Sequence, residues 1–229
     1  KISGAELVSL NPDAELINPT ISNNIIINNE SIGNESFSGE GAGIYIEVAN
    51  PIIVNNLIAH NESTFGNAKG GGIMCWWASP TIESNTIYGN SAWQYDIQDS
   101  ISIAGGIYLA GDSNPEIIKN IIWGNSEGSL NIEAQSDPLV DYSNLEVVRT
   151  DELSLINNLY SSSGTNSSEN PLFCDAPNSD FTLAENSPAL LGSIFGADQF
   201  MGAYAVGCGS IDCNNILGGS AYIDDCGDC

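Results

Sequence analysis

Aromatic side chains beside carboxylates are the residues of this sequence best suited to bind a ligand. The stretch from residue 76 to residue 95 contains Trp76, Trp77, Trp93 and Tyr95, and aspartates at positions 96 and 99 follow it. Exposed rings stack on the apolar faces of neutral sugars, and carboxylates accept hydrogen bonds from hydroxyl groups, with or without calcium. The stretch therefore predicts a carbohydrate-binding site. The other interpretation is that these rings pack a loop onto the core.

Acidic side chains near the end of the sequence are candidate calcium ligands. They are Asp212, Asp224, Asp225 and Asp228. Their spacing is not that of an EF-hand loop, so a solvated acidic linker is the competing interpretation. Calcium is the one cofactor that the sequence suggests.

Cysteines indicate an oxidising compartment, because five of the six follow residue 170. Cys75 lies two residues after Ile73, where strand alternation points it inward as a buried free thiol. Cys213, Cys226 and Cys229 form an odd set, so one of them could pair beyond the sequence. A zinc site at the C-terminal pair lacks an evident fourth ligand.

Charge limits the partners of the chain. Four basic residues oppose 29 acidic residues, for a formal net charge of −25. Nucleic acid and anionic membrane surfaces are excluded as partners, since both bind largely through Lys and Arg. No apolar run approaches the ~18 residues of a membrane span, so membrane insertion is not expected. Lys69 and Lys119 alone would not attract an acidic sugar polymer to such a surface.

His60 has no evident activating partner, and no catalytic residue is predicted.

The elements that carry these residues are defined by an internal repeat. Residues 19–29 read PTISNNIIINN, and related segments begin at Pro51, Pro80 and Pro115. Counting each proline as place zero, aliphatic residues occupy places two and seven, and asparagines occupy places five and ten. The prolines are about 30 residues apart, and short β-branched runs without helical periodicity fill each unit. This pattern predicts an all-β fold, a parallel β-helix of about five to six coils.

Stacking of the coils at ~4.8 Å would place equivalent side chains above one another. Isoleucines at places two and seven would form interior columns, and the asparagines would form ladders of amide hydrogen bonds. We also expect the asparagines to adopt the left-handed backbone of the bends. The variable segments 30–42, 62–71 and 91–105 are expected to be loops on one side.

Residues flanking place seven should point outward and form an apolar outer face. This face comprises Ile25, Ile27, Leu57, Tyr88, Ile121 and Trp123. It exceeds the apolar patches usual on a soluble monomer, so something should cover it. Either the segment 149–200 folds back over it, or another subunit does.

The repeat fades after residue 130, where Leu130–Ile132 and the segment from Pro138 form a degenerate unit without the asparagine of place five. This suits a last or nearly last coil. We expect three parts: β-helix coils over 1–148, a closing segment over 149–208 and a Cys/Asp/Gly-rich linker or stalk over 209–229.

Three motifs, NPLFCD, DFTLAENSPA and GAYAVGC, occur between Asn170 and Cys208. Together with the repeat they resemble the right-handed parallel β-helix proteins of the pectin-lyase-like superfamily, in their secreted bacterial form. The resemblance covers roughly residues 19–208 and implies a disulfide between Cys174 and Cys208. Such a loop closure adds ~4 kcal/mol in the chain-entropy model. The superfamily includes lyases, hydrolases, adhesins and non-catalytic modules, so no single activity is implied.

The sequence favours a non-catalytic structural module that is extracellular or at the cell surface and that associates with itself. The alternative is a carbohydrate-active β-helix, either a glycan-binding module or a degenerate polysaccharide lyase. The expected partners are thus further copies of the chain or an extracellular glycan.

Overall fold

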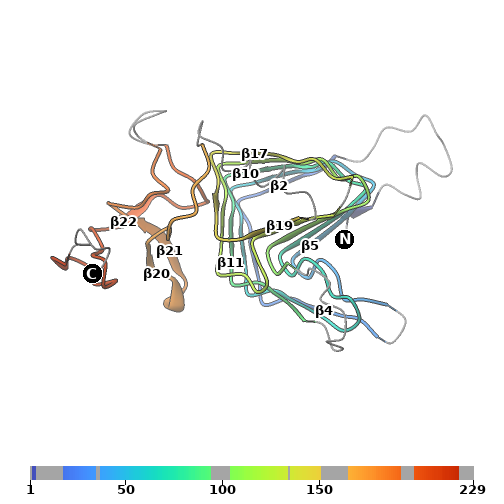
Figure 1. The fold of residues 1–229 in the computed structure, drawn as a ribbon, viewed down its shortest axis with the longest axis horizontal. Coiled ribbons are helices and arrows are strands. Elements are labelled where there is room, and N and C mark those ends of the chain that lie inside the picture. Colours follow the sequence, from blue (N-terminus) through green and yellow to red (C-terminus); the bar gives the residue numbers. More distant parts are fainter. Residues whose placement is uncertain are drawn as a thin grey trace.

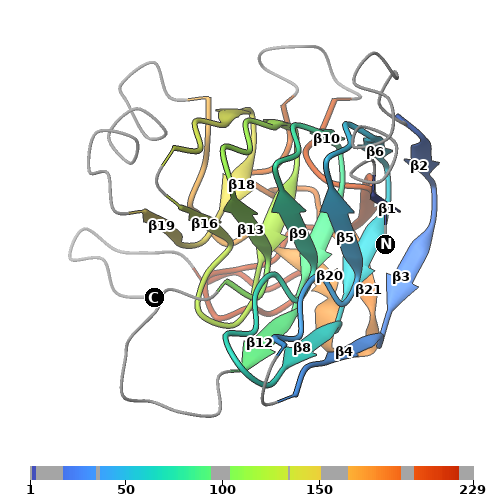
Figure 2. The same ribbon diagram turned by 90° about the vertical axis from the view of Figure 1, so that its right-hand side faces the viewer.

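Short parallel strands wind through the chain in repeated coils. The computed structural model describes residues 2–3, 18–34, 37–93, 104–133, 135–150, 165–191 and 199–221. Figure 1 looks along the stacked coils, and Figure 2 shows their strands side by side. Within the described ranges the only helical segment is a single 3₁₀ turn, Ala176–Asn178.

Three sheets of parallel strands form the sides of the coils. Sheet A contains β1 (Ile2–Ser3), β5 (Ile44–Glu47), β9 (Ile73–Trp76), β13 (Ile107–Ala110), β16 (Leu130–Ile132) and β19 (Val148–Thr150). Sheet B contains β2 (Thr20–Ser22), β6 (Ile52–Val54), β10 (Thr81–Glu83), β14 (Glu116–Ile118) and β17 (Leu139–Asp141). Sheet C contains β3 (Ile25–Ile27), β7 (Leu57–Ala59), β11 (Thr86–Tyr88), β15 (Ile121–Trp123) and β18 (Asn144–Leu145).

A fourth sheet lies where the sequence predicted only loops. Sheet D contains β4 (Glu30–Ile32), β8 (Glu62–Thr64) and β12 (Ser91–Trp93). These strands begin the variable segments of three coils, and they pair in register. Their polar residues gave little strand signal, because cross-coil pairing rather than apolar content holds them in place.

Aliphatic columns fill the interior, as the repeat predicted. Ile53, Ile82 and Ile117 are fully buried and in register across sheet B. Ile58, Ile87 and Ile122 of sheet C, and inward residues of sheet A, belong to the same core cluster. The predicted all-β parallel β-helix is confirmed.

Two side-chain ladders run along the coils at places five and ten. In each, the side-chain oxygen of one rung accepts hydrogen bonds from the preceding coil. The first ladder passes through Asn24, Asn56, Asn85, Asn120, Ser143 and Asn166. The second passes through Asn29, Asn61, Asn90 and Asn125. Ser143 therefore carries a rung in the degenerate unit, and Asn166 continues the ladder beyond residue 148.

His60 lies at place nine, which the sequence indicates as a turn position, and the structure has a bend there and a second one at place four. Positive φ angles fall one residue before each ladder asparagine, at places four and nine. The residues concerned are Asn23, Asn28, Asn55, His60, Ser84, Gly89, Lys119 and Gly124. The ladder asparagines keep ordinary φ angles, so their side chains rather than their backbones explain their recurrence. The expectation that they form the left-handed bends was wrong.

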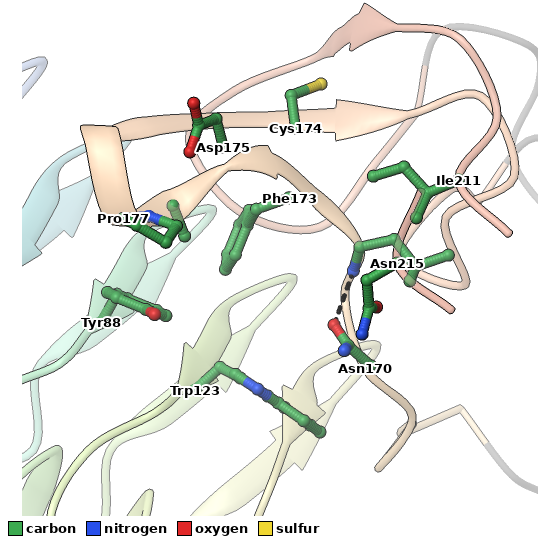
Figure 3. A pocket seen from close by; sticks show the side chains of 11 residues that line it. Tyr88, Trp123, Asn170, Phe173, Cys174, Asp175, Pro177, Ile211 and Asn215 are labelled. Atoms are coloured by element: carbon green, nitrogen blue, oxygen red, sulfur yellow. Dashed lines mark hydrogen bonds between the residues drawn. The ribbon is translucent and has the colours of Figure 1, made fainter. Parts of the chain in front are cut away.

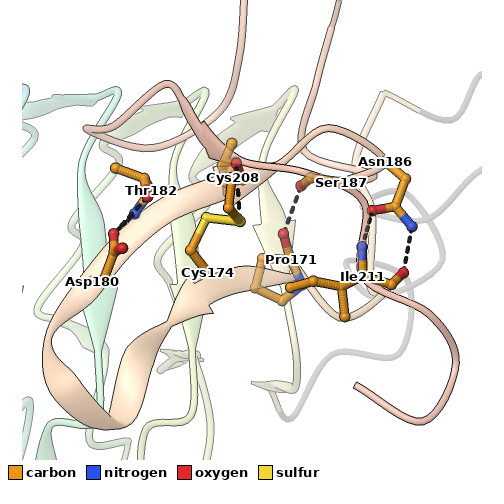
Figure 4. Close-up of a disulfide and its surroundings, with 9 residues drawn as sticks. Pro171, Cys174, Asp180, Thr182, Asn186, Ser187, Cys208 and Ile211 are labelled. Atoms are coloured by element: carbon orange, nitrogen blue, oxygen red, sulfur yellow. Dashed lines mark hydrogen bonds between the residues drawn. A yellow bond between two sulfur atoms is a disulfide. The ribbon is translucent and has the colours of Figure 1, made fainter. Parts of the chain in front are cut away.

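A small mixed sheet forms a C-terminal cap beside the coils. Its strands are β20 (Phe173–Asp175), β21 (Asp180–Ala184) and β22 (Val206–Cys208), with β20 antiparallel and β22 parallel to β21. A disulfide joins Cys174 to Cys208 across this sheet, with 5.9 Å between their Cα atoms (Figure 4). This is the pair that the resemblance implied. Asn186 exchanges two hydrogen bonds with the backbone of Ile211 nearby.

The cap lies against the outer face of sheet C, next to β11 in Figure 1. Leu57 and Ala59 pack with Phe181, and Ile121 packs with Leu183 and Met201. Two hydrogen bonds anchor the contact, from Gly202 N–H to Lys119 O and from Ala203 N–H to Thr86 Oγ1. The chain itself thus covers the middle coils. The first coil is different, since Ile25 is 66% and Ile27 is 41% exposed.

Candidate functional site

The predicted aromatic residues divide into two places. Trp76 ends β9 of sheet A, and Trp77 follows it in a left-handed bend with its ring T-shaped to Trp76 at 5.3 Å. Trp93 ends β12 of sheet D and makes no ring contact with either tryptophan among the described residues. Tyr95 lies outside the described residues. Trp77 is 58% and Trp93 is 60% exposed, so both rings are accessible.

A charged cluster adjoins the Trp76–Trp77 pair on the outer face of sheet A. Lys69 Nζ lies 2.8 Å from Glu133 Oε1, and the Tyr108 hydroxyl donates to the same oxygen at 2.7 Å. The ammonium also lies 4.8 Å from the Tyr108 ring centroid and 6.0 Å from that of Trp76. This geometry combines an ion pair with cation–π contacts. It fixes Lys69 between rings instead of presenting it to solvent.

The sequence did not predict that Lys69, Tyr108 and Glu133 meet. Lys69, Tyr108 and Glu133 come from separate coils, at the approach to β9, within β13 and after β16. Alternation places Tyr108 outward between inward Ile107 and Leu109, which is the one local signal for its position. The meeting of Lys69 with Glu133 depends on coil register.

Tyr45 lies on the same outer face, in β5 beside Met74. Burial raises the pKa of its hydroxyl to about 12, and the carboxylates of Glu40 and Glu47 act in the same direction. Tyr45 is therefore neutral at physiological pH and packs as an aromatic side chain against the cluster that contains Met74.

Other side chains that could take part in acid–base or nucleophilic chemistry also occupy packing positions. His60 has a φ of +55° at place nine, and its ring is T-shaped to Tyr88 at 5.8 Å. Cys75 is a fully buried free cysteine, and burial raises the pKa of its thiol. Lys119 donates from Nζ to Gln199 Oε1 at 3.3 Å, at the edge of the cap.

The acidic tail is described only in part. Asp224, Asp225 and Asp228, like Cys226 and Cys229, lie outside the described residues. Asp212 accepts backbone hydrogen bonds from Ile216, Asn214 and Ala221. These bonds, led by that from Ile216, lower the pKa of its carboxyl. Cys213 is disulfide-bonded. Within the described ranges, no group of three or more His, Cys, Asp or Glu side chains is placed to hold a metal ion.

A pocket opens between the outer face of sheet C and the cap (Figure 3). Its volume is about 370 Å³, and Tyr88 and Trp123 form its wall on the side of the coils. The sequence predicted both rings as part of an apolar packing face. Phe173, Asn170 and Asn215 complete the pocket from the cap side, and only the folded chain brings them there.

Among the residues that the structure describes, no helix is long and apolar enough to cross a membrane.

The stacked coils, with a disulfide-bonded cap on one side, define the chain as a parallel β-helix protein. Residues 7–173 match the family model described as the right handed beta helix region, so the chain belongs to that family. No curated protein and no solved structure matches the chain. The family establishes the fold and leaves the activity open.

Proposed function

We propose that the chain is a non-catalytic structural module of the extracellular space or the cell surface, which associates with further copies of itself. The observation that carries the proposal is that Lys69 and His60, two side chains that could act in acid–base chemistry, are held in packing contacts. Lys69 is bound by Glu133 and two rings, and His60 packs on Tyr88. A lyase base must instead reach the proton it abstracts from the sugar.

The cap disulfide and the surface charge support an extracellular location. A disulfide between Cys174 and Cys208 persists in oxidising compartments and is rare in the cytosol. A net charge of −25 keeps a secreted module soluble in a salty medium. Labelling of intact source cells with an antibody against the β-helix tests the location. Labelling that requires cell lysis would contradict it.

Self-association is proposed through the first coil. Ile25 and Ile27 on β3 and Ile32 on β4 expose large apolar side chains on strands at the edge of their sheets. Burying these side chains against a second copy would remove apolar area from water, and the edge strands could pair with it. Light scattering over a range of protein concentrations should show dimers or larger assemblies.

Serine substitutions test this contact. The double variant Ile25→Ser with Ile27→Ser should weaken association, whereas Ile52→Ser, which changes an exposed isoleucine of the second coil, should leave it intact. A strict monomer at every concentration would remove the association from the proposal. Release of product from uronate or neutral polymers would remove its non-catalytic part.

Glycan binding at the tryptophan pair is a second candidate function. The exposed Trp77 ring beside Trp76 and Lys69 provides a stacking surface with a charged neighbour. A glycan array should then show a signal that Trp77→Ala abolishes. Trp93→Ala tests whether the ring on sheet D belongs to the same site. A blank array would exclude this candidate.

A further inference from the structure

We propose that the pocket between sheet C and the cap is a binding site for one unit of a neutral saccharide. It is distinct from the Trp76–Trp77 surface, which lies on sheet A. Its volume of about 370 Å³ falls within the range of small-ligand sites, about 300–1,000 Å³. The coils supply one wall and the cap supplies the other, so the site exists only when the cap is docked (Figure 3).

Aromatic rings form the apolar part of the pocket and are held in place before any ligand arrives. The Tyr88 ring lies 5.6 Å from Phe173 and 5.0 Å from Phe181, so the cap fixes its orientation. Gly124, with a φ of +65°, leaves room beside Tyr88, because a Cβ there would lie 3.0 Å from the tyrosine ring. Such fixed rings can stack on the C–H face of a sugar with little loss of entropy.

Polar groups converge on the same space. The Asn170 Oδ1 accepts from Leu172 N–H at 3.0 Å, which orients its Nδ2 as the remaining donor. The Asp175 Oδ2 accepts from Asn178 Nδ2 at 2.8 Å, and this carboxylate lies at the edge of the pocket, turned away from Trp123 and Asn215 (Figure 3). Within the part of the chain that the structure describes, the Trp123 indole N–H, the Tyr88 hydroxyl and the Asn215 side-chain amide have no hydrogen-bond partner. The pocket thus offers amide and indole donors, with the Tyr88 hydroxyl and the Asn215 side-chain oxygen as acceptors.

This combination selects the class of ligand. Hydroxyl groups of a sugar both donate and accept, so they can satisfy the amides, the indole and the phenol hydroxyl together. The lining carries no cation, and the surface is strongly acidic, so anionic sugars are disfavoured. A cationic ligand would leave the amide and indole donors unpaired. A neutral saccharide is the ligand that uses both the rings and the polar groups.

Nuclear magnetic resonance of the four tryptophan indole N–H groups tests the site directly. The probes are methyl glycosides and disaccharides of glucose, galactose, mannose, xylose and N-acetylglucosamine. At least one probe should shift the Trp123 signal, assigned through Trp123→Phe, and leave the Trp93 signal unchanged. If no probe shifts the Trp123 signal, or if choline shifts it and no saccharide does, the proposal is overturned.

Variants separate this site from the tryptophan pair. Asn215→Ala and Tyr88→Phe should each weaken saccharide binding by about tenfold, the loss expected for one hydrogen bond. Trp77→Phe should leave it unchanged, and unaltered thermal midpoints would show that the variants remain folded. Undiminished binding in Asn215→Ala and Tyr88→Phe, or loss of binding in Trp77→Phe alone, would refute the pocket as the site. A structural module can carry such a site, so failure here leaves the proposed structural role intact.

Discussion

The side-chain amide of Asn85 donates to Oδ1 of Asn120 at 3.0 Å, and the backbone N–H of Asn85 donates to the same oxygen at 2.9 Å. Both side chains are fully buried. Asn85 Nδ2 also donates to the carbonyl oxygens of Ile53 and Glu83. A single amide therefore satisfies polar groups on three successive coils, which explains why asparagine recurs at this place of the repeat.

Replacement of this rung should destabilise the whole stack. Asn85→Ala would leave buried backbone groups of neighbouring coils without partners, and we expect a loss of about 3 kcal/mol or more in the free energy of unfolding. Urea titration followed by circular dichroism measures it. Asn85→Ser should cost less, because Ser143 already serves as a rung with its hydroxyl.

The matched control for the rung is Asn24→Ala. Asn24 belongs to the same ladder but is exposed on the first coil. Water can replace its hydrogen bonds, so we expect a loss well below that of Asn85→Ala. Equal losses at the two positions would contradict the assignment of the ladder's stabilisation to its buried rungs.

Docking of the cap should depend on Phe181. This side chain is 3% exposed and fills the space between Leu57, Ala59 and Tyr88. Phe181→Ala should destabilise the cap contact by about 3–5 kcal/mol. Hydrogen-exchange mass spectrometry should then show faster exchange over 173–208 and unchanged exchange in sheet B. Uniformly faster exchange through all coils would show that the cap and coils unfold as one unit.

The disulfide should stabilise the cap without holding the coils. Cys174 and Cys208 are 34 residues apart in sequence, and closure of such a loop contributes about 4 kcal/mol in the chain-entropy model. The double variant Cys174→Ser with Cys208→Ser should lower the thermal midpoint of the cap. The β-strand signal in circular dichroism should persist above the lowered midpoint of the cap, until the coils themselves unfold. Loss of the β signal at the lower temperature would contradict this separation.

The repeat made the interior and the ladders predictable. Place two and place seven hold aliphatic residues in each unit of the repeat. Stacking of the coils brings residues at the same place of successive units into contact. The ladder asparagines were assigned to the bends because asparagine suits both a left-handed backbone and an amide ladder. Only the φ angles at residues such as Asn55 and Ser84, one place earlier, separate these roles.

The candidate site was far less predictable, because its contacts do not follow the repeat. Thr86 meets Ala203 across 117 residues of sequence, and this contact helps decide that the cap covers sheet C. The pocket joins Trp123 of the coils to Asn215 after the cap. No periodic pattern relates such positions, so the sequence left the cover of the apolar face open between the closing segment and another subunit.

Acid should loosen the turn at Asp212. Its pKa is lowered by backbone hydrogen bonds, first from Ile216 and then from Ala221 and Asn214, so the folded turn favours the ionised carboxylate. A group with a lowered folded pKa stabilises the turn above its ordinary pKa, and this stabilisation is lost as pH falls through the folded value. Amide exchange of Ile216 should therefore be protected at neutral pH and lose protection below about pH 4. Asp212→Asn should remove this pH dependence, since an amide side chain does not titrate in this range. Persistence of the same acid transition in Asp212→Asn would assign it to another carboxyl.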